Sequence, residues 1–392
     1  MANGQKLHYN RLFKILGIQN KEDIGRISKV LGVQPQLLTY HNDNRIFPNG
    51  DLLFRVLNYL RMSEIELKLR MGVLDTKIIK WIADNPEILL DAIPEFNDEK
   101  ISNFTVSYET DLGSLYQADC IKFMKTMDEG SIDMIFADPP FNLGKVYESG
   151  VDDELSEERY LEWTEAWLLE CVRILAPGGS LFVYNIPYWQ NHIANVLNRY
   201  LNFRHWIAIY MKGLVPVGGK LNPSHYGLLY YTKGERPKTF NKQRIPMATC
   251  RHCGGEIFDY GGKKKNLHEN GLSIADVWTD IHPVRHKKFK NRELNELSVK
   301  LLHRIISLAT NKGDILFDPF GGSGTTYAVA ECLQRRWIGC EIGSIEPIIN
   351  RLQNKDDSSM IEKIENETNV LFTEEQRLRR KQNKFWLLED LR

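Results

Sequence analysis

The sequence predicts an α/β fold built on a doubly wound, Rossmann-like sheet, with a small all-α domain ahead of it. Short apolar strands at 132–136 and 180–184 flank a helix at 157–175, and a strand, a glycine-rich loop and a helix follow one another over 313–334. Nearer the N-terminus, helices at 22–31, 35–42 and 50–60 are separated by turn residues such as Gly32.

The order of these patterns divides the chain into six regions. A helical domain (1–74) and a linker (75–105) precede the first half of an α/β domain (106–211). An insert (212–292) with little periodicity follows, typical of a loop-built surface. The second half of the α/β domain (293–352) contains a helix at 294–309, a strand at 314–317, a helix at 325–334 and a strand at 337–340. The last region (353–392) is a charged, helical tail.

The bulk composition indicates a soluble, cytoplasmic protein with no membrane segment. No apolar run approaches the ~20 residues of a membrane-spanning helix, and the segment Met1 to His8 lacks the apolar core of a secretory signal. The six cysteines are scattered apart from one pair, as in a reducing compartment. The formal net charge is zero, yet the segment from Lys212 to Arg292 holds sixteen Lys and Arg against six Asp and Glu. That segment alone favours a nucleic-acid partner.

The first motif that carries chemistry is Asp138-Pro139-Pro140-Phe141-Asn142, directly after the strand at 132–136. In a doubly wound sheet the ends of such strands face the ligand crevice. The Asp138 carboxylate and the Pro139 carbonyl, held by stiff prolines, are acceptors suited to polarising a poorly nucleophilic base amine. Phe141 can stack on a base taken out of the duplex. Taken alone, the same residues could form a simple strand-ending turn.

The second motif, Asp318-Pro319-Phe320-Gly321-Gly322-Ser323-Gly324-Thr325, lies between a strand and a helix. Its glycines allow close approach to a nucleoside, and Glu341 ends the next strand, where a carboxylate grips ribose hydroxyls. No phosphate-binding Gly-Lys-Ser/Thr and no complete Gly-x-Gly-x-x-Gly is present. Because Asp318 suits a cationic amino-acid tail, the composition fits S-adenosylmethionine better than ATP or a dinucleotide.

Together and in this order, the two motifs resemble the amino-methyltransferases of bacterial restriction-modification systems, in the permuted arrangement called beta class. The resemblance covers roughly Tyr116 to Leu352 and implies an S-adenosylmethionine-dependent methyltransferase fold in circularly permuted order, acting on double-stranded DNA. By resemblance, Asp138, Pro139 and Phe141 match the catalytic motif, Phe320, Gly322 and Gly324 the cofactor loop, Glu341 the ribose carboxylate and Asp119 an acidic position on the adenine ring of the cofactor. With their neighbours in the two motifs, the predicted catalytic residues are Asp138, Pro139, Pro140 and Phe141, and the predicted cofactor-binding residues are Asp119, Asp318, Phe320, Gly322, Gly324, Thr325 and Glu341.

Two departures from the family pattern are visible. Phe141 stands where the family usually has Tyr, which keeps the stacking ring and removes a hydroxyl. Asn295-Glu296-Leu297 stands where the family often has Gln-Lys-Pro, so no contacts are expected there. Asp rather than Ser at the head of the catalytic motif favours adenine N6 as the target, with cytosine N4 as the alternative.

The basic insert lies where the family carries its target-recognition segment. Lys263, Lys264, Arg285, Lys287 and Lys288 are therefore candidate phosphate contacts, although such charge runs are usually solvated surface. Cys250 and Cys253 have the spacing of half a structural zinc site, which His268, His282 or His286 would have to complete. The alternative, a tight turn with two free thiols, is the favoured interpretation.

The N-terminal helices resemble the helix-turn-helix domains of phage repressors across Asp23 to Leu69. The first helix and its glycine turn match 27–33, and the recognition helix would span 35–41. Gln34, Gln36, Thr39 and Tyr40 would then face the DNA groove. The alternative is a helical bundle used for packing or dimerisation.

The leading hypothesis is thus a site-specific DNA methyltransferase, with a cognate restriction endonuclease and a homodimer as possible further partners. A different class is a DNA-binding regulator with an inactive methyltransferase fold, and a third is an RNA or protein amine methyltransferase. The intact motifs oppose the regulator, and the permuted order and the basic insert oppose the third class.

Overall fold

The computed structural model describes residues 11–44, 46–85, 104–143, 155–211, 219, 221–281, 296–354 and 357–390. The chain divides into two compact units, Met1–Glu99 and Lys100–Arg392, and each is described by itself. None of the helices in these described ranges is long and apolar enough to cross a membrane.

The first unit is all helical. Its helices are α1 (Arg11–Leu16), α2 (Lys21–Leu31), α3 (Pro35–Asp43), α4 (Gly50–Leu60), α5 (Glu64–Met71) and α6 (Thr76–Asp84). Helix α2 begins where Asn20 accepts a hydrogen bond from the Asp23 amide, and it ends at Gly32, whose φ of 66° favours glycine. Helix α6 lies in the segment expected to be linker, because its N-cap Asp75 and its apolar face make a stable helix of it.

The second unit is built on one mixed sheet. Within its described residues nine strands pair in the order β1-β2-β11-β10-β3-β4-β6-β5-β9. Their bounds are β1 Tyr108–Glu109, β2 Gly113–Gln117, β3 Ile132–Ala137, β4 Leu175–Asn185, β5 Asn202–Tyr210, β6 His225–Thr232, β9 Val277–Trp278, β10 Ile315–Asp318 and β11 Arg336–Glu341. A separate pair joins β7 (Arg244–Ile245) to β8 (Leu272–Ser273).

The strands β2, β11, β10, β3 and β4 run parallel, so their carboxyl ends share one edge of the sheet. The strand order changes direction between β10 and β3, because β11 and β2 lie on one side of β10 and β3 and β4 on the other. In doubly wound sheets a ligand binds outside such a switch point. The α/β prediction, with helices ahead of it, is confirmed.

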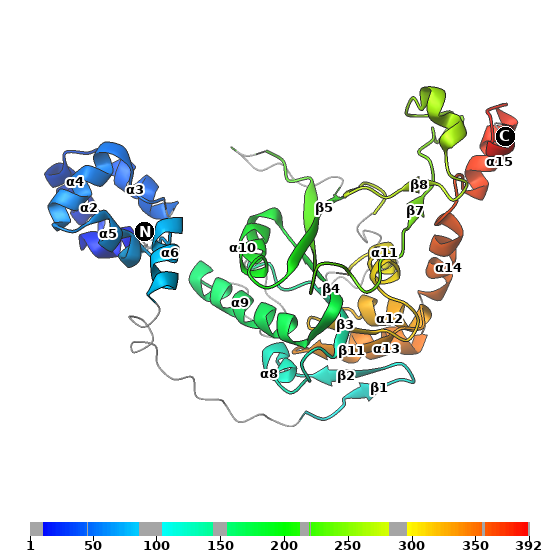
Figure 1. Ribbon diagram of the computed structural model, residues 1–392, viewed down its shortest axis with the longest axis horizontal. Coiled ribbons are helices and arrows are strands. Elements are labelled where there is room, and N and C mark those ends of the chain that lie inside the picture. Colours follow the sequence, from blue (N-terminus) through cyan, green and yellow to red (C-terminus); the bar gives the residue numbers. More distant parts are fainter. Residues whose placement is uncertain are drawn as a thin grey trace, which may run out of the picture. The chain divides into compact units, whose positions relative to one another are not determined.

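Helices cover both faces of the sheet (Figure 1). On one face, α8 (Cys120–Met124), α9 (Glu157–Ile174) and α10 (Pro187–Leu197) pack on alternate strand residues such as Ile135 and Val183. On the other, α11 (Val299–Ala309), α12 (Thr325–Cys332), α13 (Glu346–Asn354) and α14 (Ser358–Glu367) pack on the intervening ones, such as Phe136 and Phe182. Helix α9 turns aromatic side chains to the core, with Tyr160 and Trp167 almost inaccessible.

The largest departure from expectation lies in the insert. It contributes β6, which pairs with β4 and β5 inside the main sheet, and β9 at its edge. The described part of the tail, beyond α14, forms α15 (Glu374–Gln382) and a short turn at Leu388–Asp390. The insert is therefore partly sheet, and only its outer portion is built from loops.

Candidate active site

The carboxylates singled out from the sequence gather at one edge of the sheet. Asp318 ends β10 and Glu341 ends β11, whereas Asp138 directly follows β3 and Asp119 is the second residue after β2. These strands are neighbours, in the order β2-β11-β10-β3. Asp318 and Asp138 therefore flank the switch point, one from each side.

The Pro140-Phe141-Asn142 part of the catalytic motif is held by the two helices behind it. The Tyr160 hydroxyl donates to the Pro140 carbonyl (2.6 Å) and the Trp189 indole N–H donates to the Phe141 carbonyl (2.7 Å). Asn142 exchanges two hydrogen bonds of 2.9 Å with the Leu155 backbone and has a φ of 52°. The backbone of a non-glycine residue is strained in this left-handed region, and the surrounding hydrogen bonds must maintain it.

The Pro139 carbonyl differs from the two carbonyls that follow it in the motif. Whereas the carbonyls of Pro140 and Phe141 are taken, the Pro139 carbonyl accepts no hydrogen bond from any described residue. The Asp138 side chain is half-buried at the same turn. The turn can therefore offer a carboxylate and a backbone carbonyl to one amine.

Aromatic rings surround Asp138. Phe141 lies 5.7 Å from Tyr226 and 6.2 Å from Tyr184 between ring centroids, and the two tyrosines lie 5.3 Å apart. Burial, with the nearby Asp138 charge adding to it, raises the pKa of both tyrosine hydroxyls, so both stay protonated at neutral pH. Tyr184 and Tyr226 were not singled out from the sequence; Tyr226 belongs to β6, whose place beside β4 no local pattern reveals.

Asp318 is the most deeply buried carboxylate of the group, with 2% of its surface exposed. Its oxygens accept hydrogen bonds from the Phe320 amide (2.9 Å) and the Thr326 hydroxyl (2.6 Å). Burial nevertheless outweighs these bonds and raises the pKa of this carboxyl to about 7. A cation beside it would restore the charged form.

Glu341 bridges the glycine loop and the turn after β11. One of its oxygens accepts from the Gly322 amide (2.7 Å) and the other from the Gly343 amide (2.7 Å). A carboxylate oxygen has a second lone pair, so each can still accept a hydroxyl. Gly322 and Gly324 both have positive φ, and a Cβ on Gly324 would lie 2.9 Å from the Ile348 side chain.

The remaining residues of the expected cofactor site take defined places around this loop. Phe320 packs against Trp163 and Trp167, with ring centroids 5.8 and 5.2 Å away. Asp119 caps α8 by accepting from the Lys122 amide (3.0 Å). Thr325 is buried at the first turn of α12, 3.1 Å from the Ser323 hydroxyl, so its side chain serves the loop itself.

The expected phosphate contacts of the insert divide into two groups. Lys263 is exposed, but Lys264 is half-buried, pairs with Glu256 at 3.0 Å and lies over the Trp386 ring at 5.5 Å. Lys264 is thus engaged within the protein, which the charge run alone could not show. Arg285, Lys287 and Lys288 lie outside the described residues.

The Cys250–Cys253 pair forms a tight turn. The Cys250 amide donates to the Gly255 carbonyl and the Gly254 amide to the Cys250 carbonyl, both at 2.8 Å. Among the described residues no group of three or more His, Cys, Asp and Glu is placed to hold a metal ion. His268 is committed to the Asn270 amide, and His282 and His286 lie outside the described residues. The turn accounts for the pair as free thiols, and zinc is not supported.

In the N-terminal unit, Gln34, Gln36 and Tyr40 are exposed. Thr39 is half-exposed and its hydroxyl donates to the Pro35 carbonyl (3.1 Å) within α3. The opposite face of α3 buries Leu38, His41 and Asn42. The four expected DNA-facing residues therefore lie away from the core of their unit.

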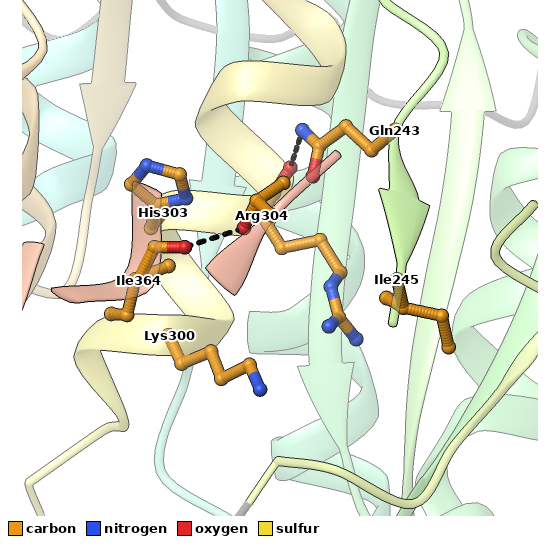
Figure 2. Close-up of a pocket in the computed structure, with 7 residues that line it drawn as sticks. Gln243, Ile245, Lys300, His303, Arg304 and Ile364 are labelled. Atoms are coloured by element: carbon orange, nitrogen blue, oxygen red, sulfur yellow. Dashed lines mark hydrogen bonds between the residues drawn. The ribbon is translucent and has the colours of Figure 1, made fainter. Parts of the chain in front are cut away.

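A cavity of about 10 Å³ lies far from these motifs in the chain, between the start of the outer insert, α11 and α14 (Figure 2). Gln243, His303 and Arg304 are among its lining residues. Such a volume holds a single water molecule at most. This cavity is therefore no cofactor site.

Comparison with known proteins gives a family and several relatives. The model of the DNA methylase family N6_N4_Mtase matches residues 132–349. The chain is 46% identical over 373 residues to the Type II methyltransferase M.BamHI of Bacillus amyloliquefaciens, covering 93% of this chain and 88% of that protein. It is 33% identical over 243 residues to the Type II methyltransferase M.HpaI of Haemophilus parainfluenzae, covering 61% of this chain and 73% of that protein.

A solved structure with a similar arrangement is that of the PvuII DNA methyltransferase (cytosine-N4-specific). It shares 18% identity with a TM-score of 0.48, over 67% of this chain and 95% of that one.

Proposed function

Because the chain belongs to the N6/N4 family of DNA methylases and is a DNA methyltransferase, we propose that it transfers a methyl group from S-adenosylmethionine to an exocyclic amine of a flipped base. The observation that supports this most is the placement of Asp138 and Asp318 on the two sides of the switch point. One carboxylate is placed for the amine and the other for the cofactor.

The residues of the glycine loop fit S-adenosylmethionine. The buried Asp318 carboxyl, with its raised pKa, suits the cationic amino-acid end of that molecule. Glu341 keeps lone pairs for the ribose hydroxyls, and the positive φ of Gly322 and Gly324 keeps side chains out of the loop. Asp119 would face the adenine ring and Phe320 would close the apolar side. When bound, the cofactor supplies a methyl group on a sulfonium, which is electrophilic without further activation.

The chain's own residues contribute to the reaction by polarising the amine of the target base. The amine lone pair is delocalised into the base ring, and two acceptors draw its hydrogens so that the nitrogen becomes pyramidal. Asp138 supplies one acceptor and the Pro139 carbonyl, which accepts no hydrogen bond from the described residues, supplies the other. The bonds from Tyr160 and Trp189 fix the neighbouring carbonyls, and so hold both acceptors in position before the base arrives.

The rings around Asp138 would receive the base. A flipped base loses its stacking in the duplex and can regain it on aromatic faces of the protein. Phe141, with Tyr184 and Tyr226 beside it, provides such faces. The neutral tyrosines can also donate a hydrogen bond without adding charge beside Asp138.

The proposed target base rests on the residue at the head of the catalytic motif. Asp138 in that position favours adenine N6, and cytosine N4 is the alternative because both amines present the same geometry to the two acceptors. Sequencing of DNA from cells that express the protein, with detection of modified bases, tests the proposal. We expect a methylated amine at one recurrent sequence, whereas no modified base at any sequence would refute the proposal.

Two wider roles complete the proposal. Two relatives are named Type II methyltransferases, and we propose that this chain likewise modifies DNA alongside a cognate restriction endonuclease. The N-terminal unit would act as a helix-turn-helix module, with Gln34, Gln36, Thr39 and Tyr40 of α3 and its start facing DNA. We also propose that the protein forms a homodimer, through the N-terminal unit or through the tail.

A further inference from the structure

We infer that the tail and the outer insert form one DNA-recognition module, residues 244–273 together with 369–390, in which the buried Arg380 is a positioning residue for the insert. The inference rests on the proposed function, and it assigns the tail a part in target recognition. Five features of the described residues support it.

The tail is joined to the insert through backbone hydrogen bonds on two sides. The Met247 amide donates to the Leu371 carbonyl and the Leu371 amide donates to the Glu269 carbonyl, both at 2.9 Å. The Asn369 amide donates to the Arg244 carbonyl at 3.0 Å, and the Arg244 amide returns a bond to the Asn369 side chain at 2.9 Å. The tail segment 369–371 is therefore hydrogen-bonded to residues in or beside both strands of the β7–β8 pair, which come from the insert.

Gly271 shows how closely the two segments approach. A Cβ at this position would lie 2.5 Å from the Ile245 carbonyl oxygen and 2.6 Å from that of Val370. Both atoms are backbone, one from the insert and one from the tail, so neither can swing aside. The φ of 98° also favours glycine at this position.

The module has its own apolar core. Met247 from the insert is fully buried with Leu371, Phe372 and Leu387 from the tail. Tyr260, Leu267, Leu272, Trp386 and Leu388 pack around them. This cluster is separate from the two cores of the main sheet, so neither segment could bury its apolar side chains without the other.

Arg380 of α15 is completely buried, although it carries a charge. Its guanidinium donates to the Gly254 carbonyl of the cysteine turn (2.7 Å) and twice to the Trp386 carbonyl (2.9 and 2.8 Å). It also lies over the Phe372 and Trp386 rings, at 4.5 and 4.6 Å from their centroids, and 3.5 Å from Glu256. A buried cation is tolerated only when its donors are satisfied, and here they hold the insert's outer turn against the tail.

The root of the insert is fixed separately, on the catalytic unit. The Arg304 guanidinium donates to both carboxylate oxygens of Asp280 (2.9 and 2.6 Å). The backbone carbonyl of Arg304 accepts a hydrogen bond from the Gln243 side chain (2.9 Å), which Figure 2 draws. Disturbing Arg380 would therefore loosen the outer turn while the root stays in place. The effect should be on recognition and not on the catalytic edge.

The surface of the module offers cations to a polyanion. Exposed cations come from both segments, Arg251, Lys263 and Lys265 from the insert and Lys381 and Lys384 from the tail, although both segments also expose carboxylates such as Asp259 and Glu374. Cationic side chains gain binding energy by releasing counterions from DNA phosphates. Because the surface charge is mixed, the partner is taken from the proposed function: it is the duplex that supplies the target base.

The test compares Arg380→Met with Gln382→Met, a control at an exposed and uncharged position of the same helix. A second pair compares Gly271→Ala with Gly234→Ala, which has a φ of 101° and open space around it. For each variant, kcat, KM for target DNA, discrimination against a site with one altered base pair, and Kd for S-adenosylmethionine are measured.

For Arg380→Met and Gly271→Ala we expect KM for DNA to rise about tenfold and discrimination to fall by a similar factor. The value of kcat at saturating DNA and the cofactor Kd should stay within about twofold, as should every parameter of both controls. Arg380→Lys, which keeps a charge but loses the fork of donors, should restore part of the loss.

Unchanged KM and discrimination in both variants would overturn the inference, and so would a parallel loss of cofactor binding, which would make the tail a support for the whole domain. If Arg380→Met does not fold, the glycine pair decides alone. Failure of the proposed function is distinguishable, because the wild-type protein would then methylate no DNA at all.

Discussion

At the scale of single residues, two carboxylates are placed in different environments by neighbouring strands. Asp318 is sealed under the glycine loop and its pKa is raised to about 7, while Asp138 stands half-buried among aromatic rings. Carboxylates in such different surroundings suit different chemical roles. We assign Asp318 to a cation and Asp138 to an amine on this basis.

The raised pKa of Asp318 predicts a pH dependence of cofactor binding. Because the folded-state pKa lies above the usual 3.8, Asp318 favours folding below about pH 4, and that contribution is lost as the pH rises through about 7. A bound cation reverses this preference by favouring the carboxylate. The cofactor Kd should therefore rise as the pH falls below 7, by up to about tenfold per pH unit.

Isothermal titration between pH 5.5 and 7.5 measures this dependence. Asp318→Asn, which cannot ionise, should bind weakly and with a flat profile. A wild-type profile as flat as that of the variant would show that Asp318 does not face the cationic end of the cofactor.

At the scale of elements, helices and strands are predicted best where the signals in the sequence are local. Strands β3, β10 and β11 and helices α2, α4 and α12 lie within a few residues of their expected bounds, because apolar runs, caps and glycines act locally. Strand β6 was missed, although it is apolar from Tyr226 to Tyr231, because turn-rich sequence surrounds it and its partners β4 and β5 precede it in the chain.

The glycine loop before α12 gives a prediction at this scale. Gly324→Ala would place a Cβ 2.9 Å from Ile348 and force a left-handed φ of 76°, whereas Gly313→Ala meets a similar φ of 83° with nothing within 4 Å. Both lose the backbone freedom of glycine, worth about 1 kcal/mol, but only Gly324 lies in the loop that we propose for the cofactor.

Calorimetry should therefore show a cofactor Kd raised about tenfold for Gly324→Ala and little changed for Gly313→Ala. Equal effects in the two variants would mean that backbone strain alone, and not the shape of the loop, governs binding.

At the scale of the whole molecule, the sequence located the motifs but not the long-range contacts that assign charged residues their roles. Lys263 and Lys264 are adjacent in sequence and identical in type, yet only Lys264 is held by Glu256 and Trp386. The same holds for the tail, which was predicted only as charged and helical, whereas Arg380 is fully buried. Such contacts depend on the fold of distant segments, which no local spacing records.

Salt dependence separates the two lysines. Each phosphate contact contributes about 0.9 to the slope of log affinity against log salt for duplex DNA. Lys263→Gln should lower the magnitude of the slope by about one such unit, and Lys264→Gln should leave it unchanged. Fluorescence anisotropy across 50 to 300 mM salt, about the range where such slopes are measured, provides the values. An equal change in both variants would contradict the structural assignment.

The N-terminal unit gives a second prediction at this scale. Replacing Gln36 and Tyr40 of α3 by Ala should weaken DNA binding about tenfold and leave kcat at saturating DNA unaltered. The matched control replaces the exposed Asn58 and Tyr59 of α4 in the same unit. Identical DNA affinity in the two double variants would favour a packing or dimerisation role instead.

The central claim is that Asp138 and the Pro139 carbonyl polarise a base amine for methylation. Transfer of labelled methyl from S-adenosylmethionine to DNA, by the wild-type protein and by Asp138→Ala, tests it most directly, with the exposed Asp111→Ala as control. We predict N6-methyladenine, or N4-methylcytosine, in the digested DNA, a kcat lower by about 100- to 1000-fold in Asp138→Ala, and a control that matches the wild type. Labelled DNA formed at the wild-type rate by Asp138→Ala would contradict the account.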